Sequence, residues 1–162
     1  MSAAAQTRLR WQGPVALRAW LYVLAWLAII FLFSSESFSE PSTGSLLRPF
    51  LRWLFPEWSA SETRALHHLI RKAAHMGVYG VLALLSFRAI RLSLAATLLR
   101  LAGLALALVF AAGATDEFLQ SFSETRTGSR MDVGYDFAGA VVALALLVAW
   151  RRAHGGIRNP SA

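Results

Sequence analysis

Two adjacent carboxylates, Asp116 and Glu117, end a long run of Leu, Ala, Val and Gly that is typical of a lipid-facing helix. His75 and Asp136 lie near the starts of two other apolar stretches. Imidazole and carboxylate groups transfer protons and bind polar ligands near neutral pH. Ionisable groups beside a membrane span are costly, and they usually face the bundle interior and pair with one another. We therefore expect the helices that carry these groups to bring them together.

The composition predicts a membrane protein. Apolar residues make up 56% of the 162 positions, compared with about 45–50% in soluble globular chains. The chain has no cysteine, which excludes disulfides, thiol catalysis and cysteine-ligated metals. The net charge of +7 does not indicate a nucleic-acid partner, because the basic residues lie between apolar runs and not on one polar face.

Four apolar stretches predict an all-α, polytopic fold within a single domain over 1–162. The expected spans are 15–33, 73–90, 98–115 and 133–150, each close to the roughly 20 residues that cross a bilayer. A signal peptide is the alternative for the first stretch, but no small-x-small cleavage pattern precedes the polar residues 34–36. The Ser59-x-x-Glu62 pattern is a helix start signal, so the second helix should begin near Ala60 and continue to about Ile90.

The charged residues predict the orientation of these spans. With four spans, the two termini and the loop 88–97 share one side, and nine arginines but no acid lie there: Arg8, Arg10, Arg18, Arg88, Arg91, Arg100, Arg151, Arg152 and Arg158. The outer loops 34–72 and 116–132, together with Asp136, hold every acid. The positive-inside rule then predicts cytoplasmic N- and C-termini.

Polar side chains recur at four-residue steps on three helices, so on each helix they share one face. The steps are Arg71, His75 and Tyr79 on the second helix, Asp116 and Gln120 on the third, and Asp132 and Asp136 on the fourth. The third helix should therefore continue one or two turns beyond its span. Together these steps predict one polar mouth on the outer side.

Three motifs at this mouth resemble those of the VanZ-like membrane proteins. They are Lys72-x-x-His75 with Tyr79, then Asp116-Glu117-x-x-Gln120-x-Phe122-x-x-x-Arg126, then Asp132-x-x-x-Asp136-x-x-Gly139. Ser34-Ser35 is similar to a further signature, and the resemblance runs from about 31 to 147. The chain departs from the family in having Asp136 where Asn is usual, and Glu36 where Gln is frequent.

The resemblance implies a four-helix integral membrane domain of bacteria with its polar signature on the outer side. The family takes its name from a protein associated with teicoplanin resistance. From the four-residue steps and these motifs together, the expected ligand-binding residues are Arg71, Lys72, His75, Tyr79, Asp116, Glu117, Gln120, Arg126, Asp132 and Asp136.

Three functional interpretations stay open for this cluster. In the first, the charged side chains form an ion-pair network that holds the helix ends together. Alternatively, Arg71, Lys72 and Arg126 would bind the phosphate or carboxylate of a membrane lipid, an envelope lipid or a peptidoglycan precursor. In the third interpretation the protein is an enzyme, with His75 as general acid or base beside Asp116 or Glu117. We favour the head-group site and keep His75, Asp116 and Glu117 as the candidate catalytic residues of the enzyme interpretation.

No metal or cofactor is predicted. His75 and the carboxylates of Asp116, Glu117, Asp132 and Asp136 are suitable ligands, but their spacing matches no known metal motif and nearby arginines would repel a cation. The adjacent His67 and His68 point about 100° apart on a helix, so we expect them to be solvated or interfacial.

Two further features concern packing. The segment 46–55 is apolar, with Arg48 and Arg52, and it is too short to span. It predicts an interfacial or re-entrant segment over the outer leaflet, or a hydrophobic plug. Glycines within the spans should allow close helix approach, namely Gly77, Gly80, Gly103, Gly113, Gly134 and Gly139.

Overall fold

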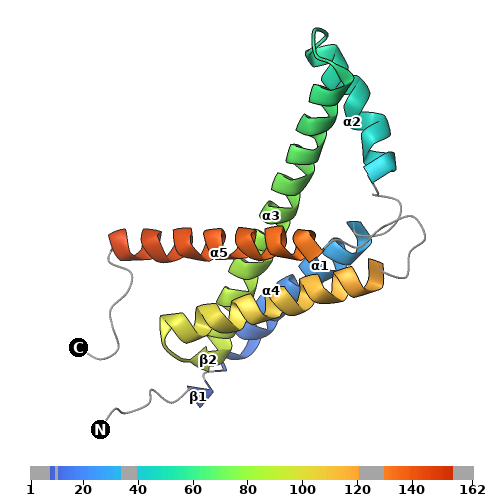
Figure 1. The fold of residues 1–162 in the computed structure, drawn as a ribbon. Helices are drawn as coiled ribbons and strands as arrows, with labels where there is room; N and C mark the ends of the chain where they lie inside the picture. Colours follow the sequence, from blue (N-terminus) through green and yellow to red (C-terminus); the bar gives the residue numbers. More distant parts are fainter. Residues whose placement is uncertain (1–7, 10, 34–39, 121–129, 155–162) are drawn as a thin grey trace.

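Five helices make up nearly all of the part of the chain that the structure, a computed structural model, describes: residues 8–9, 11–33, 40–120 and 130–154 (Figure 1). They are α1 (Gly13–Phe33), α2 (Glu40–Leu54), α3 (Ala60–Ser93), α4 (Leu98–Gln120) and α5 (Arg130–Ala153). The helices α1, α3, α4 and α5 are long and apolar enough to cross a membrane. The prediction of an all-α membrane fold with four spans is confirmed.

A small antiparallel ladder closes one end of the molecule. Strand β1 (Arg8–Leu9) pairs with β2 (Leu94–Ala95), which directly follows α3, and Leu9 lies opposite Leu94. In addition, the backbone N–H of Gln12 donates to the carbonyl of Leu92 at 3.2 Å. The segment before α1 is therefore tied to the turn between α3 and α4.

Helix α3 is the centre of the fold. It contacts each of the other four helices, and α4 also packs on α5. Its side chains Tyr79, Leu82 and Phe87 are almost fully buried, while many large apolar side chains on the outer faces of α1, α4 and α5 are exposed. Such exposure fits a lipid solvent, which is as apolar as leucine.

Two indole hydrogen bonds join α1 to α3. Trp26 Nε1 donates to the carbonyl oxygen of Val78, and Trp20 Nε1 donates to Ser93 Oγ, both at 2.9 Å. A polar group without a partner costs several kcal/mol in a hydrocarbon environment. These bonds therefore satisfy the indoles and fix α1 along α3.

Three of the six span glycines pack as the sequence predicts. A Cβ on Gly139 would overlap the backbone of Met76, and a Cβ on Gly80 would lie 3.3 Å from the Gly139 carbonyl oxygen. Gly113 faces α3 and α5. The prediction is wrong for Gly77, Gly103 and Gly134, because a Cβ at each of them would meet no atom within 4 Å. Helical spacing alone does not reveal which side of a helix a neighbour covers.

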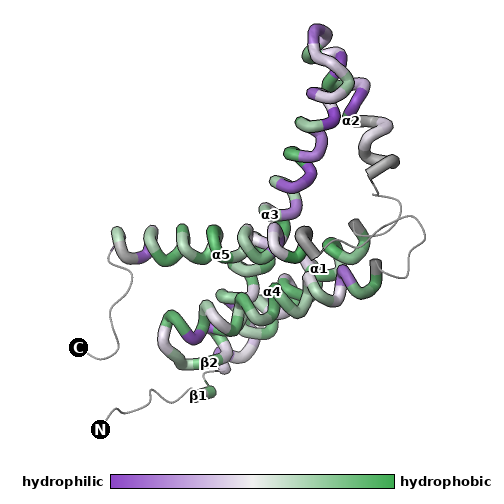
Figure 2. The backbone as a smooth tube through the Cα atoms, viewed as in Figure 1, coloured by the Kyte–Doolittle hydropathy of each residue, from purple (hydrophilic) through white to green (hydrophobic). Residues whose placement is uncertain are grey.

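The first part of α3 projects away from the other long helices (Figure 1). A helix of 34 residues is about 51 Å long, whereas the hydrocarbon layer is about 30 Å thick. Figure 2 shows hydrophilic residues gathered in this projecting part. The predicted start is confirmed: Ser59 Oγ accepts from the Glu62 N–H, and the Ser59 N–H donates to the Glu62 carboxylate.

Helix α2 packs on the projecting part of α3. It begins at Glu40 and ends at Leu54, so the helix is longer than the segment 46–55 that its apolar residues indicated. Leu51 is buried, while Phe50 and Trp53 are exposed. The exposed aromatic side chains suit the predicted interfacial position, which stays a prediction.

The expectation that both neighbouring histidines are solvated or interfacial is wrong for His67. Its side chain is only 2% exposed, whereas His68 is exposed. His67 lies four residues after Thr63, which is also buried, on the segment of α3 where α2 packs. This packing of α2 is a tertiary contact, and the sequence pattern of two adjacent histidines does not indicate it.

Candidate functional site: a polar mouth formed by α3, α4 and α5

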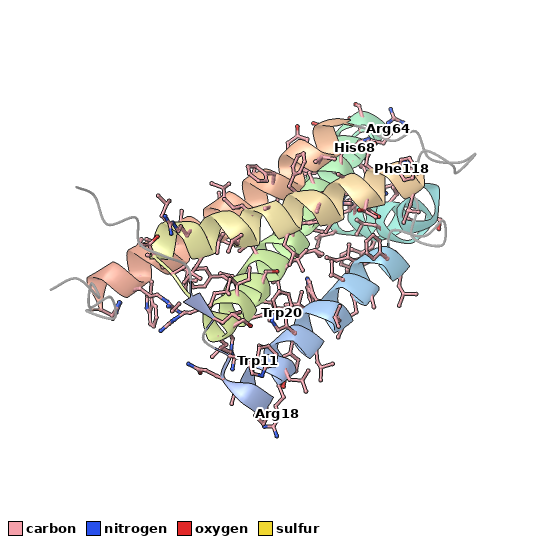
Figure 3. All side chains as sticks on the ribbon, turned by 90° about the horizontal axis from the view of Figure 1, so that it is seen from below. Trp11, Arg18, Trp20, Arg64, His68 and Phe118 are labelled. Carbon is pink, nitrogen blue, oxygen red and sulfur yellow. The ribbon has the colours of Figure 1, made fainter. Side chains whose placement is uncertain are left out.

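The predicted polar residues whose side chains the structure describes lie where the middle of α3 meets the end of α4 and the start of α5. His68 of α3 and Phe118 of α4 lie near this end in Figure 3, and Arg18 and Trp11 lie at the opposite end. The α4 helix continues past Thr115 to Gln120, so the predicted continuation of the third helix is confirmed, while its position outside the membrane stays a prediction. We call the group His75, Tyr79, Asp116, Glu117 and Asp136 the polar mouth.

A contact between a histidine and a carboxylate joins α3 to α5 in the polar mouth. His75 Nδ1 lies 3.3 Å from Asp136 Oδ1. The Asp136 side chain is 7% exposed and that of His75 is 33% exposed. In this pair the carboxylate is therefore buried, whereas the imidazole is accessible from outside the protein.

A second buried layer lies below this pair. Tyr79 is 1% exposed and Asp116 is 5% exposed. The carboxylates of Asp116, Asp136 and Glu117 all lie close enough to the Tyr79 hydroxyl to act on it electrostatically. Helix α3 thus carries a phenol into a region where three carboxylates from α4 and α5 converge.

Gly113 makes room for this convergence. A Cβ at this position would lie 3.8 Å from Tyr79 Cε1 and 3.9 Å from Asp136 Oδ2. These are ordinary van der Waals distances, so an alanine would fit here, whereas a larger side chain would meet the phenol ring and the carboxylate. A small residue thus lies between α4 and the two other helices just before the acidic pair.

A cation from α3 lies at the rim. Lys72 Nζ donates to Tyr135 Oη at 3.2 Å and lies 4.4 Å from the centroid of the Tyr135 ring. Lys72 belongs to the sequence motifs above, whereas Tyr135 does not. Tyr135 lies three residues after Asp132 and next to Asp136. The helical repeat of the fourth-helix motif therefore indicates Tyr135 as a further residue of the rim.

The remaining predicted residues fall into two groups. Arg71 is half-buried on α3, one helical turn before His75. The side chains of Gln120 and Asp132, which lie in α4 and α5, and all of Arg126 lie outside the part of the chain whose side chains the structure describes. Their roles stay predictions.

The geometry suits hydrogen bonding and proton transfer. A half-exposed imidazole against a buried carboxylate donates or accepts a proton according to the group that approaches it. Among the described residues, no group of three or more His, Cys, Asp or Glu side chains has an arrangement that would hold a metal ion.

Comparison with known families agrees with the motifs. The family model described as VanZ/LLP1 matches residues 19–151. The chain belongs to the VanZ/LLP1 family. No match was found among curated proteins or among solved structures. The family match begins twelve residues before the resemblance that the motifs indicated, inside α1, and ends at Arg151 in α5. The protein is therefore a VanZ-family, multi-pass membrane protein.

The VanZ/LLP1 assignment gives the Asp136 departure a physical meaning. The resemblance leads one to expect Asn at this position, and an acid there adds a negative charge. In this VanZ-family protein that carboxylate is buried against His75. The added charge therefore lies beside a side chain that becomes cationic on protonation.

Proposed function

We propose that this VanZ-family protein uses the polar mouth to bind the head group of a lipid or of a cell-envelope precursor at the outer face of a bacterial cytoplasmic membrane. The observation that carries the proposal is the His75–Asp136 contact at 3.3 Å, with its imidazole one-third exposed. Polar groups that only join helices are usually enclosed between them. An exposed imidazole on a buried acid is suited to a ligand.

The chemistry of the mouth suggests which head groups it favours. Buried carboxylates at Asp116 and Asp136 attract ammonium or hydroxyl groups, while Arg71 and Lys72 offer donors for a phosphate or carboxylate. A zwitterionic head group carries both kinds of group. The mouth is therefore complementary to an aminated phospholipid or to a precursor that contains amines and acids.

The orientation follows from the distribution of charge. The start of α1, the turn between α3 and α4 and the end of α5 hold arginines and no acid. The positive-inside rule then supports cytoplasmic termini and an outward mouth. A link to teicoplanin resistance, which the family name carries, forms part of the proposal and predicts lower teicoplanin susceptibility when the protein is expressed.

The first test compares the stability of variants with and without ligand. The purified full chain carries His75→Gln or Asp116→Asn, and its thermal midpoint is measured in detergent with and without total envelope lipid extract. We expect the variants to be as stable as wild type or more so without lipid, because buried charges kept for a ligand reduce stability. Saturating ligand should raise the wild-type midpoint by about 5 °C or more, and the variants much less.

Matched controls lie on the projecting part of the same protein. His68→Gln makes the same change at an exposed position of α3, and Glu57→Gln removes an exposed acid. Both should keep the full response to lipid. If His75→Gln and Asp116→Asn deplete the folded protein and extract does not stabilise wild type, the polar mouth is a structural network and the proposal is wrong.

One observation also favours an enzyme as a second candidate. A histidine held by a buried carboxylate is a common arrangement for general acid–base catalysis. The structure pairs His75 with Asp136, whereas the sequence analysis gave that role to Asp116 or Glu117. A proton-transfer enzyme would lose all conversion of an envelope lipid or peptide in His75→Gln at unchanged protein level. Retained conversion would exclude His75 from that role.

A further inference from the structure

A pocket at the opposite end of the molecule is lined by three arginines. Its volume is about 410 Å³, within the roughly 300–1,000 Å³ typical of small-ligand sites. Arg88, Arg91 and Leu92 come from the last turns of α3, Arg151 comes from the end of α5, and Gln12 lies just before α1. We call it the arginine pocket.

Among the residues that the structure describes as lining this pocket, none carries a carboxylate. The sequence has no Asp or Glu before Glu36, between Glu62 and Asp116, or after Asp136. Arg91 and Arg151 are close enough to repel each other electrostatically. The dipole of a helix C-terminus supplies only about half a negative charge, so the ends of α3 and α5 together do not balance three guanidinium groups.

A contact holds Arg151 in place despite this repulsion. Its guanidinium carbon lies 5.4 Å from the centroid of the Phe87 ring, one turn before Arg91 on α3. Such a cation–π contact attracts the guanidinium to the face of the ring. The side chain is thereby kept half-buried at the pocket and does not extend freely away from the protein.

We propose that the arginine pocket binds a phosphate-bearing anion. Guanidinium forks match phosphate oxygens in a bidentate manner, and three of them on two helices surround a space large enough for such a group. Trp11 and Trp150 are exposed near the same ends of α1 and α5, as expected at the level of lipid head groups. This position favours an anionic phospholipid over free phosphate as the source.

The arginine pocket is independent of the polar mouth. It shares no residue with that site and lies at the other end of the bundle. Its test therefore succeeds or fails whatever the polar mouth binds.

The experiment measures binding of a defined lipid to the purified full chain. Phosphatidylglycerol is titrated into detergent micelles, with phosphatidylcholine of the same acyl chains as reference, and the thermal midpoint gives a dissociation constant. Arg91→Gln and Arg151→Gln should each weaken phosphatidylglycerol binding about tenfold or more, since each removes a charged hydrogen-bonding partner. Without lipid, Arg91→Gln should be at least as stable as wild type because the repulsion is relieved, whereas Arg151→Gln also loses the contact with the Phe87 ring and should gain less stability.

Arg18→Gln is the matched control. Arg18 lies on the same side of the membrane by sequence and is exposed, but it does not line the pocket. It removes the same charge and should change the dissociation constant less than twofold. If Arg151→Gln is too unstable to purify, Arg88→Gln, at an exposed pocket position, replaces it.

A second arm separates the two sources of phosphate. Inorganic phosphate is added at constant ionic strength, with chloride as the balancing anion. Stabilisation by phosphate that Arg91→Gln abolishes supports the pocket with a free anion as its ligand. Stabilisation by phosphatidylglycerol alone supports a lipid head group. If neither probe binds, or if the pocket variants lose no more affinity than Arg18→Gln, the proposal is overturned.

Discussion

Asp136 is the residue whose interpretation differs most between the sequence and the structure. From the motif alone it is an anomaly, an acid where an amide is expected, on the edge of a span. In the structure it is buried and contacts His75 at 3.3 Å. The acid and the histidine therefore form one unit across α3 and α5, and each should depend on the other.

A double-mutant cycle measures that dependence. His75→Gln and Asp136→Asn, alone and combined, should show a coupling free energy of about 1 kcal/mol or more, because contacting polar groups are not additive. Unfolding by a denaturing detergent in mixed micelles gives the free energies.

The same cycle with Asp116→Asn in place of Asp136→Asn is the comparison. The sequence analysis paired His75 with Asp116 or Glu117, whereas the structure pairs it with Asp136. We expect the coupling to Asp116 to be the smaller of the two. Equal or greater coupling to Asp116 would contradict the geometry.

Helical spacing predicts which polar residues share a face, but not which of them pair across helices. Four-residue steps place Arg71, His75 and Tyr79 on one face, because the helical period is a local property. Which carboxylate meets His75 depends on how far α5 is shifted along α3. That shift follows from the close approach of Gly139 to Met76, a contact between residues far apart in the chain, and no local pattern encodes it.

At the scale of elements, the α3–α5 crossing depends on one glycine. Gly139→Ala should destabilise the protein by about 1–3 kcal/mol, because a Cβ there would overlap the backbone of Met76 and force the helices apart. The measurement is the free energy of unfolding in mixed micelles, together with the amount of folded protein in membranes.

Gly134→Ala on the same helix is the control. A Cβ at Gly134 meets no atom within 4 Å, so alanine should be neutral or should stabilise the helix by about 0.5–1 kcal/mol. If both substitutions have the same effect, the close approach of α5 to α3 does not limit stability.

The sequence predicts the long helices, but it predicts only part of the hairpin that α2 and α3 form. The cap at Ser59 and Glu62 is local and marks the start of α3 correctly. The start of α2 at Glu40 carries no comparable apolar signal, since the residues before 46 are polar or small. Burial of His67 follows from α2 packing, so it was missed together with the extent of that helix.

At the scale of the whole molecule, the two ends differ in charge. The polar mouth gathers carboxylates, and the arginine pocket gathers guanidinium groups. A bilayer orients a protein according to the arginines and lysines of its short loops. The end with the arginine pocket should therefore face the cytoplasm.

Paired reporters at the C-terminus test this orientation. A fluorescent protein fused after Ala162 should fluoresce, and alkaline phosphatase at the same position should be inactive, because the first folds in the cytoplasm and the second requires the outer side. The two fusions serve as mutual controls. Phosphatase activity without fluorescence would reverse the proposed topology and place the polar mouth inside.

The ladder between β1 and β2 sets an order on the synthesis of this protein. Leu9 pairs with Leu94, so the partner strand of β1 is absent until roughly eighty more residues have been added. At a bacterial ribosome making about 5–20 residues each second, that interval is about 4–16 seconds. During this time α1 is already available to the insertion machinery without its anchor. Strand β1 therefore pairs with β2 only after the first two long helices, α1 and α3, have been made. Its pairing is a late step in the biogenesis of the protein.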